Sequence, residues 1–295
     1  MYPSRGDALL IASMRLSGAL TGSVAILIFV FLVAESWPAL LEVGAGFFND
    51  ASWHPSAAAD DGSFGLGPML TGTLAAAAGA LLLATPVALL SAIFCHFYAS
   101  SLLAALYRRL VEVLAGVPSV VYGFWGLVVL VPLIRQIEPP GPSLLAGILV
   151  LAIMILPTLA LSADAAFAAV PDDFLKAAAA LGLPRVAVIA HVVMPASRSG
   201  LATGFLLATG RAVGETMAVL MVCGNVVQTP DNLFAPIRTL TANIALEMAY
   251  ALGDHRSALF VSGLVLMVLV TVLVLTAAGL TGAGHRPAKE RRGAA

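Results

Sequence analysis

Two charged side chains, Arg211 and Glu215, lie inside an otherwise apolar run between residues 201 and 223 of this 295-residue chain. A charge at the depth of a lipid bilayer costs about 2.5 to 3.5 kcal/mol on insertion scales, so such residues usually pair or line a wet cavity. Because they are four residues apart, the two side chains are expected to share a helix face and neutralise each other. The sequence therefore predicts either an internal ion pair or a polar site within the membrane.

Three further polar residues lie near the cores or ends of predicted membrane spans: Thr216, Ser119 and Asn225. Their side chains can hydrogen-bond a transported solute, or they can simply bond a neighbouring helix, which is common in membrane proteins. With Arg211 and Glu215 they make up the predicted substrate pathway.

The sequence contains no catalytic set and no metal-ligand spacing. The histidines are scattered at positions 54, 96, 191, 255 and 285, and no acid, base and nucleophile cluster at one depth. Cys95 and Cys223 lie in apolar surroundings and are interpreted as small packing residues. We therefore expect neither an enzyme nor a metalloprotein.

The composition indicates a membrane protein. Hydrophobic residues make up 60% of the chain and charged residues only 11%, against roughly 25% charged residues in soluble domains. Lipid offers no partners to backbone polar groups, so each span must be a helix of about 20 residues. We expect an all-α, polytopic protein with six spans at about 16–34, 68–94, 111–131, 144–163, 201–223 and 258–280. The net charge of −1 gives no indication of nucleic-acid binding.

Two alternatives affect the number of spans. The run at 16–34 could be a secretory signal, but it is long for one and no small-x-small cleavage pattern follows it. The uncharged stretch at 62–107 could hold two short spans, although one long helix kinked at Pro86 agrees better with the distribution of basic residues. Most Lys and Arg residues then fall on one side, which predicts that both termini are cytoplasmic.

Other charged residues are assigned no function. Glu112 is expected to pair with Arg108 or Arg109 near the inner end of the third span. Glu247 and His255 are expected in an outer loop.

The segment at 170–200 predicts two short helices between the fourth and fifth spans. Pro171 and two carboxylates suit the start of the first helix, and Gly182 suits its end. Pro184 can start the second helix, through Arg185 to Val193, and Pro195 is expected to close it. Such a hairpin can transmit movement between spans, or it can lie on the bilayer surface as an amphipathic segment.

This segment resembles the EAA loop of ABC importer permeases. The family pattern is Glu-Ala-Ala, three residues, Gly, nine residues and Ile-x-Leu-Pro. Here Lys176-Ala177-Ala178, Gly182 and the run Val192 to Pro195 occupy the same spacing, with Lys176 in place of Glu. The resemblance implies a type I ABC importer permease fold and a loop that transmits ATPase closure to the membrane helices. The residues expected to couple to the ATPase are Asp172, Asp173, Lys176, Ala177, Ala178, Gly182, Pro184, Arg185 and Pro195.

Other stretches resemble the phosphate-specific permeases of the PstC type. They are Phe64-Gly65 with Gly72-Thr73, Leu114–Gly123, Gly210–Ala218 and Leu240–Ala245 with Glu247. The functional interpretation of the two buried charges is that Arg211 offers its planar set of donors to phosphate oxygens, while Glu215 holds and masks it between cycles.

The resemblance also implies an assembly in the bacterial cytoplasmic (inner) membrane. Its other members would be a PstA-type second permease subunit, two ATP-binding cassette subunits and a periplasmic or surface phosphate-binding protein. No G-x-x-x-x-G-K-[ST] loop occurs in this chain, so we expect no cofactor of its own and ATP bound by the partner subunits.

We expect three regions: a first span and outer loop at 1–61, a permease core at 62–282 that contains the coupling loop, and a basic cytoplasmic tail at 283–295.

Two other functions stay open. The same scaffold could carry sulfate, molybdate or another small solute. An ion-coupled secondary carrier is disfavoured because no repeat of the Gly-Arg-x-x-Gly-Glu segment occurs in residues 1–150.

Overall fold

The computed structural model describes the backbone of residues 5–55 and 62–282 and the side chains of residues 10–55 and 62–276. The predicted tail at 283–295 lies outside the described residues. The fold is almost entirely helical, with one two-stranded antiparallel sheet that pairs Trp53 with Phe64. The elements are α1 (Arg5–Val43), α2 (Gly46–Asn49), β1 (Trp53–His54), β2 (Ser63–Phe64), α3 (Gly67–Ile93), η1 (Phe94–Tyr98), α4 (Ser101–Ala115), α5 (Ser119–Trp125), η2 (Gly126–Leu130), α6 (Val131–Ile137), α7 (Leu144–Ala168), α8 (Asp172–Ala180), α9 (Arg185–Val188), η3 (Ile189–Val193), α10 (Met194–Gly214), α11 (Met217–Val222), α12 (Leu240–Glu247) and α13 (Gly253–Gly282).

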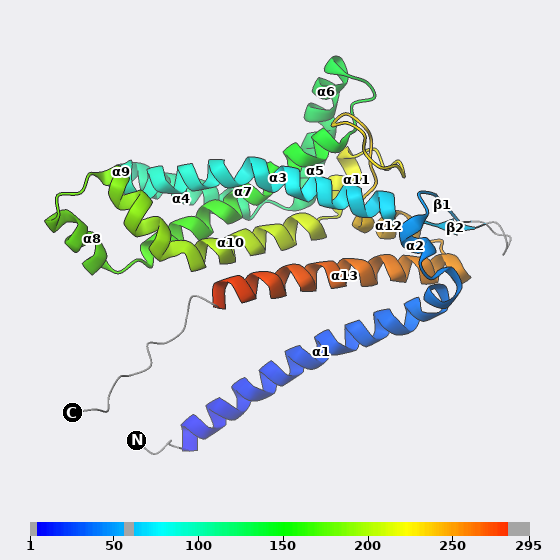
Figure 1. The fold of residues 1–295 in the computed structure, drawn as a ribbon, viewed down its shortest axis with the longest axis horizontal. Coiled ribbons are helices and arrows are strands. Elements are labelled where there is room, and N and C mark those ends of the chain that lie inside the picture. Colours follow the sequence, from blue (N-terminus) through cyan, green and yellow to red (C-terminus); the bar gives the residue numbers. More distant parts are fainter. Residues whose placement is uncertain (1–4, 56–61, 283–295) are drawn as a thin grey trace.

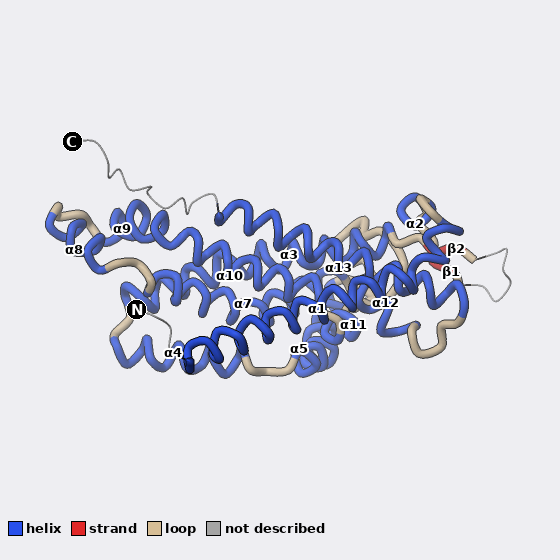
Figure 2. The backbone as a smooth tube through the Cα atoms, turned by 90° about the horizontal axis from the view of Figure 1, so that it is seen from below, coloured by secondary structure: helices blue, strands red, loops and turns tan. Residues whose placement is uncertain are grey.

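Within the described residues, six helical stretches are long and apolar enough to cross a membrane, as the sequence predicts. They are Leu10–Val43, Gly67–Tyr98, Ser119–Ile137, Leu144–Ala168, Arg185–Gly214 and Gly253–Thr276. Figure 1 shows α3, α4, α7 and α10 side by side, with α13 beneath them and α1 diverging from α13. Helices α8 and α9 lie at one end of the bundle, and α2, the strands and α12 lie at the other (Figure 2). We call these the inner and the outer end.

The long uncharged stretch forms one span, and the alternative of two short spans is wrong. Helix α3 contains Pro86 and runs on through the π-helical turn η1, so the chain crosses once between Gly67 and Tyr98. The starts of α1 and α4 and the end of α13 consequently point toward the same end as α8 (Figure 1).

The third span begins later than the predicted 111–131. Helix α4 ends at Ala115, and a new helix, α5, begins after Pro118. Pro118 lacks a backbone N–H and restricts the residue before it, so the helix cannot continue through this position. The predicted span therefore combined the end of α4, a separate inner helix, with the first part of the apolar stretch Ser119–Ile137.

Pro195 does not close the second helix of the coupling loop, contrary to the sequence prediction. Helices α9, η3 and α10 run continuously from Arg185 to Gly214. The π-helical turn Ile189–Val193 ends two residues before Pro195, and such a wider turn accommodates the missing N–H of proline within a continuous helix. The second coupling helix is thus an extension of a membrane span.

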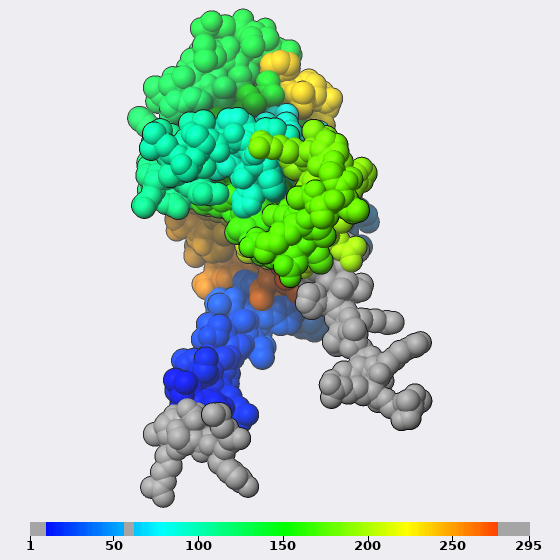
Figure 3. Space-filling model, turned by 90° about the vertical axis from the view of Figure 1, so that its left-hand side faces the viewer, coloured from blue at the N-terminus to red at the C-terminus, as the bar shows by residue number. Residues whose placement is uncertain are grey.

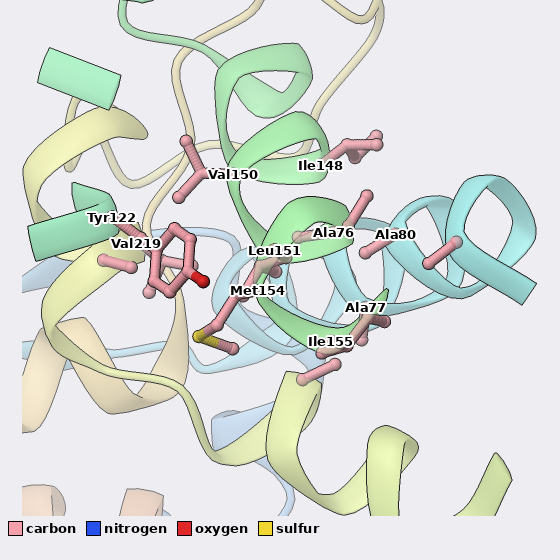
Figure 4. Close-up of a cluster of buried hydrophobic side chains, with 14 of the residues drawn as sticks. Ala76, Ala77, Ala80, Tyr122, Ile148, Val150, Leu151, Met154, Ile155 and Val219 are labelled. Atoms are coloured by element: carbon pink, nitrogen blue, oxygen red, sulfur yellow. The ribbon is translucent and has the colours of Figure 1, made fainter. Parts of the chain in front are cut away.

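The core lies around α7, which is the most deeply buried span. Small residues of α3 face it and let the two backbones approach closely, as is usual in membranes. A Cβ atom on Gly79 would lie 2.5 Å from Ile148 Cδ1. The buried side chains between these helices include Ala76, Ala77, Ala80, Leu151 and Ile155 (Figure 4).

Candidate substrate pathway and coupling surface

Arg211 lies in the last turn of α10, halfway through the membrane-spanning bundle. Its Nη1 donates to Thr158 Oγ1 at 3.3 Å, and Thr158 lies near the middle of the 25-residue helix α7. The side chain is half-buried. Among the described residues, no carboxylate is within ion-pair distance of its guanidinium. Most of its donors are therefore available to a ligand.

Glu215 does not pair with Arg211, so the predicted ion pair is wrong. Helix α10 ends at Gly214, and Glu215 is extended with φ −69° and ψ 132°, so the two residues do not share a helix face. Glu215 Oε1 instead accepts from the backbone N–H of Ala218 at 3.2 Å, in the first turn of α11. Thr241 Oγ1 donates to the backbone oxygen of Glu215 at 2.7 Å and ties this break to α12.

Thr216 and Ser119 lie at the starts of two short helices that pack together. Thr216 precedes α11 and its Oγ1 donates to Gly214 O at 3.4 Å, while Ser119 is the first residue of α5. A Cβ atom on Gly123 of α5 would lie 2.8 Å from Ala218 Cα of α11, so these helices are in close contact. Both hydroxyl-bearing residues are half-buried, and in the described part of the chain neither forms a hydrogen bond with Arg211.

Asn225 forms a turn at the end of α11. Its φ of 57° is left-handed, a conformation that Asn tolerates better than most residues. Its Nδ2 donates to Leu220 O at 2.8 Å, and its backbone oxygen accepts from Arg238 Nε at 2.9 Å. The structure thus places Asn225 beside an outer charge cluster and not beside Arg211.

The outer cluster surrounds the buried carboxylate of Glu247 at the end of α12. No role for these residues was predicted from the sequence. Trp53 Nε1 donates to Oε2 at 2.7 Å, His255 Nε2 lies 2.8 Å from the same oxygen, and Arg238 Nη1 donates to Oε1 at 2.6 Å. Burial alone would raise the pKa of the Glu247 carboxyl. The three hydrogen bonds and the Arg238 charge nevertheless lower that pKa below its ordinary value.

The inner cluster joins Asp164 of α7, Arg108 of α4 and His96 of η1. Arg108 Nε and Nη2 donate to the two oxygens of Asp164 at 2.7 and 3.1 Å, and His96 Nδ1 lies 3.2 Å from Oδ1. Glu112 is exposed and forms no ion pair with Arg108 or Arg109 in the described residues, so the expected pairing is wrong. Asp164 lies one residue beyond the predicted fourth span. The rule that carboxylates near membrane depth seek a partner could have identified it.

The coupling loop forms an exposed hairpin at the inner end. Asp172 and Asp173 open α8, and Gly182, with φ 65°, ends it as predicted. Lys176 Nζ lies 3.7 Å from Asp173 Oδ1 on an exposed face, so its charge is partly balanced within α8.

The inner surface of the hairpin holds it against the bundle. Ala178 is buried while Ala177 and Pro195 are exposed, and Pro184 precedes Arg185, whose Nη1 donates to Phe97 O at 3.4 Å. Viewed from this end, the loop (yellow-green) lies beside the segment around α4 (cyan-green) in the middle of the face (Figure 3).

No group of three or more His, Cys, Asp or Glu residues that could hold a metal ion occurs within 5–55 and 62–282. Both cysteines are buried and unpaired by a disulfide.

The described residues thus form a polytopic membrane protein, with six helical stretches long enough to cross a bilayer and an exposed helical hairpin between two of them. Residues 84–281 match the family of binding-protein-dependent transport system inner membrane components. The chain belongs to this family, which confirms the resemblance found in its loop.

Curated relatives confirm the resemblance to PstC-type permeases. The phosphate transport system permease protein PstC of Mesorhizobium japonicum is 36% identical, covering 92% of this chain and 88% of that protein. PstC of Haemophilus influenzae is 35% identical and covers 84% of each chain. The probable ABC transporter permease protein YqgH of Bacillus subtilis is 36% identical, over 86% of this chain and 84% of that one.

Solved structures show the same fold. A chain of the MetNI methionine ABC transporter in an inward-facing conformation aligns with a TM-score of 0.57 and 19% identity, over 75% of this chain and 94% of that chain. A chain of a bacterial ABC transporter involved in alginate import aligns with a TM-score of 0.57 and 13% identity, over 94% and 99% of the two chains. The type I ABC importer permease fold predicted from the loop is confirmed.

Proposed function

We propose that this chain is a permease subunit of an ATP-driven phosphate importer and that Arg211 binds phosphate during its passage. The observation that carries the proposal is the guanidinium of Arg211, which lies at mid-depth in a transport fold without a carboxylate partner among the described residues. An unpaired charge at this depth is costly, so a wet site that receives an anion accounts for it. A guanidinium presents parallel N–H donors that match two phosphate oxygens.

The break between α10 and α11 shapes this site. Because Glu215 turns away to hold the start of α11, it does not mask the Arg211 charge. Within the hydrocarbon region, irregular backbone occurs where protein groups or water satisfy its N–H and C=O hydrogen-bonding groups. Thr216 and Ser119, which start α11 and α5, are proposed to supply hydroxyl groups along the same route.

The inner end is proposed to be cytoplasmic and to dock on an ATPase. The Lys and Arg residues of α4, α8 and α9 lie at this end, in accord with the positive-inside rule. Movement of α9 reaches Arg211 through one continuous helical stretch of 30 residues, about 45 Å long at 1.5 Å per residue. We propose that this stretch couples ATPase closure to the phosphate site.

The remaining members of the assembly follow from this proposal. A second, PstA-type permease subunit completes the pathway, two ATP-binding cassette subunits bind ATP, and a phosphate-binding protein delivers the solute at the outer end. The chain itself performs no catalysis and needs no cofactor. The complex works in a bacterial cytoplasmic membrane with both termini inside.

The test is uptake of labelled phosphate at low concentration in cells that lack this gene, with and without the wild-type chain. We expect ATP-dependent uptake that unlabelled phosphate and arsenate suppress and that sulfate and molybdate leave unchanged. Restored uptake of sulfate or molybdate, with phosphate uptake unaffected, would overturn the substrate assignment while leaving the family intact.

A further inference from the structure

The inner cluster joins three helices through one carboxylate. Asp164 belongs to the last turns of α7, Arg108 to α4 and His96 to η1, the turn that ends the second span. Arg108 engages both oxygens of Asp164, a two-bond arrangement that fixes direction as well as distance. The Asp164 side chain is only 18% exposed. The contact therefore fixes α4 and α7 relative to each other at the inner end.

The coupling loop packs on side chains that contact this cluster. Buried Phe167, Val170 and Val193 form one hydrophobic group. Phe97 of η1 and Leu175 of α8 pack against this group. The ring of His96 contacts those of Phe97 and Phe167, with centroids 4.7 and 6.2 Å apart. Arg185 at the start of α9 donates to the backbone oxygen of Phe97. A displacement of α8 or α9 consequently reaches His96 and Asp164 through packed side chains.

Charge balance alone does not require this geometry. A lysine at position 108 would neutralise Asp164, but its ammonium group is a point charge and cannot make two parallel hydrogen bonds. The orientation of α4 on α7 depends on those two bonds. The variants Arg108→Lys and Asp164→Asn can therefore separate charge balance from alignment.

We propose that Asp164 is a positioning residue for transport: through Arg108 and His96 it makes α4 and the end of α3 follow the coupling loop. The proposal rests on the proposed function only in assuming an ATP-driven complex, and not in the identity of the solute. This role requires no contact between the solute and Asp164 or Arg108. Their substitution separates ATP hydrolysis from movement of the membrane helices.

The experiment follows α4 itself in the complete complex. Arg109 is exposed on α4 next to Arg108, and the native Cys95 and Cys223 are buried, so a cysteine at position 109 can be labelled selectively. The rate of labelling of Arg109→Cys is measured with and without ATP, together with ATP hydrolysis and the amount of assembled complex. Glu112→Gln, which removes an exposed carboxylate from the same helix, is the matched control.

We expect ATP to change the labelling rate in the Arg109→Cys background and in the Glu112→Gln control. In Asp164→Asn and Arg108→Lys that ATP-dependent change should shrink on the order of tenfold, the size expected when a charge-assisted hydrogen bond is lost. Assembly and ATP hydrolysis should persist in Arg108→Lys.

An unchanged ATP response in Arg108→Lys and Asp164→Asn overturns the proposal, and so does a response that falls only in proportion to assembled complex. Failure of both variants to assemble also overturns it, because the cluster is then a fixed structural contact. Because labelling does not depend on the solute, a complex that responds to ATP but carries no phosphate contradicts the proposed function alone.

Discussion

The two ends of the bundle each hold one carboxylate between an arginine and a histidine, but they differ in burial and in what they join. The side chains of Arg238, Glu247 and His255 in the outer cluster are 18%, 8% and 12% exposed, and Trp53 ties in the segment after α1. In the inner cluster Arg108 is 40% exposed, and its neighbours pack on the coupling loop. The outer cluster is therefore suited to a fixed scaffold and the inner one to a contact that moves with the loop.

Arg211 lies between these ends and lacks such an arrangement. Its single side-chain bond, to Thr158, leaves the charge unbalanced by the described residues. The comparison thus separates the charges of the two clusters, which are paired with one another, from the charge of Arg211, which has no carboxylate partner in the described residues and is proposed to bind a transient anion.

Removal of Arg238 should have the largest effect on stability. In Arg238→Ala the Glu247 carboxylate stays buried without its main cation, a loss that costs about 3 to 5 kcal/mol in such pairs. We expect a marked fall in the amount of folded protein and in its midpoint of thermal unfolding, measured in detergent. Arg135→Ala, an exposed arginine in α6, should leave both unchanged. Equal effects of the two variants would contradict the view of the outer cluster as a scaffold.

The outer cluster should also make stability dependent on pH. The pKa of Glu247 is lowered in the fold, so the unfolded chain binds more protons and the stabilisation is complete above the unfolded pKa. It is lost as pH falls through the lowered pKa of the folded state. The midpoint of thermal unfolding of the wild type should therefore fall when the pH drops below the ordinary pKa of glutamate. Glu247→Gln should be less stable at neutral pH and should lose this part of the pH dependence. If the midpoint of Glu247→Gln falls at acid pH as much as that of the wild type, Glu247 is not the source of the pH dependence.

The turn of the coupling loop should show a smaller effect. Gly182 has a φ of 65°, and no atom lies within 4 Å of the place that a Cβ would take, so Gly182→Ala introduces backbone strain without steric overlap. The left-handed conformation costs an alanine about 1 to 2 kcal/mol. We expect reduced phosphate uptake at unchanged amounts of assembled complex. Gly18→Ala on α1, where φ is ordinary and space is open, is the control and should transport normally.

Lys176 should have the smallest effect on stability. Its pairing with Asp173 is long and both side chains are largely exposed, so it contributes at most about 0.2 to 1 kcal/mol. Lys176→Ala should leave the thermal midpoint within error of the wild type. A drop as large as that of Arg238→Ala would mean that the exposed and buried pairs do not differ as described.

Apolar runs and loop spacing were sufficient to predict the six spans, the helical hairpin and the family. The residues that shape the site were harder to predict. The sequence pattern of Arg211 and Glu215 is compatible with one helix, and only the backbone shows that α10 ends at Gly214. Likewise, Pro195 is normally a stop, but the π-helical turn before it lets the helix continue.

The charge clusters could be predicted only in part. Trp53 of β1 and Glu247 of α12 are 194 positions apart and meet only in the folded chain, a contact that no local pattern encodes. Asp164 could have been predicted to need a partner, because it lies at the end of a strongly apolar run. The identity of that partner could not have been predicted, because Arg108 has Glu112 nearby on its own helix and yet pairs with Asp164 of α7.

Phosphate binding by Arg211 is best tested by comparing Arg211→Ala with Arg198→Ala, both on α10. Arg198 is exposed near the inner end of that helix. Labelled phosphate uptake is normalised to the amount of complete complex recovered from the membrane. We expect Arg211→Ala to assemble normally and to reduce uptake to background, while Arg198→Ala transports like the wild type. Normal uptake by assembled Arg211→Ala, or loss of assembly that accounts for all of its lost uptake, would contradict the claim that Arg211 binds phosphate.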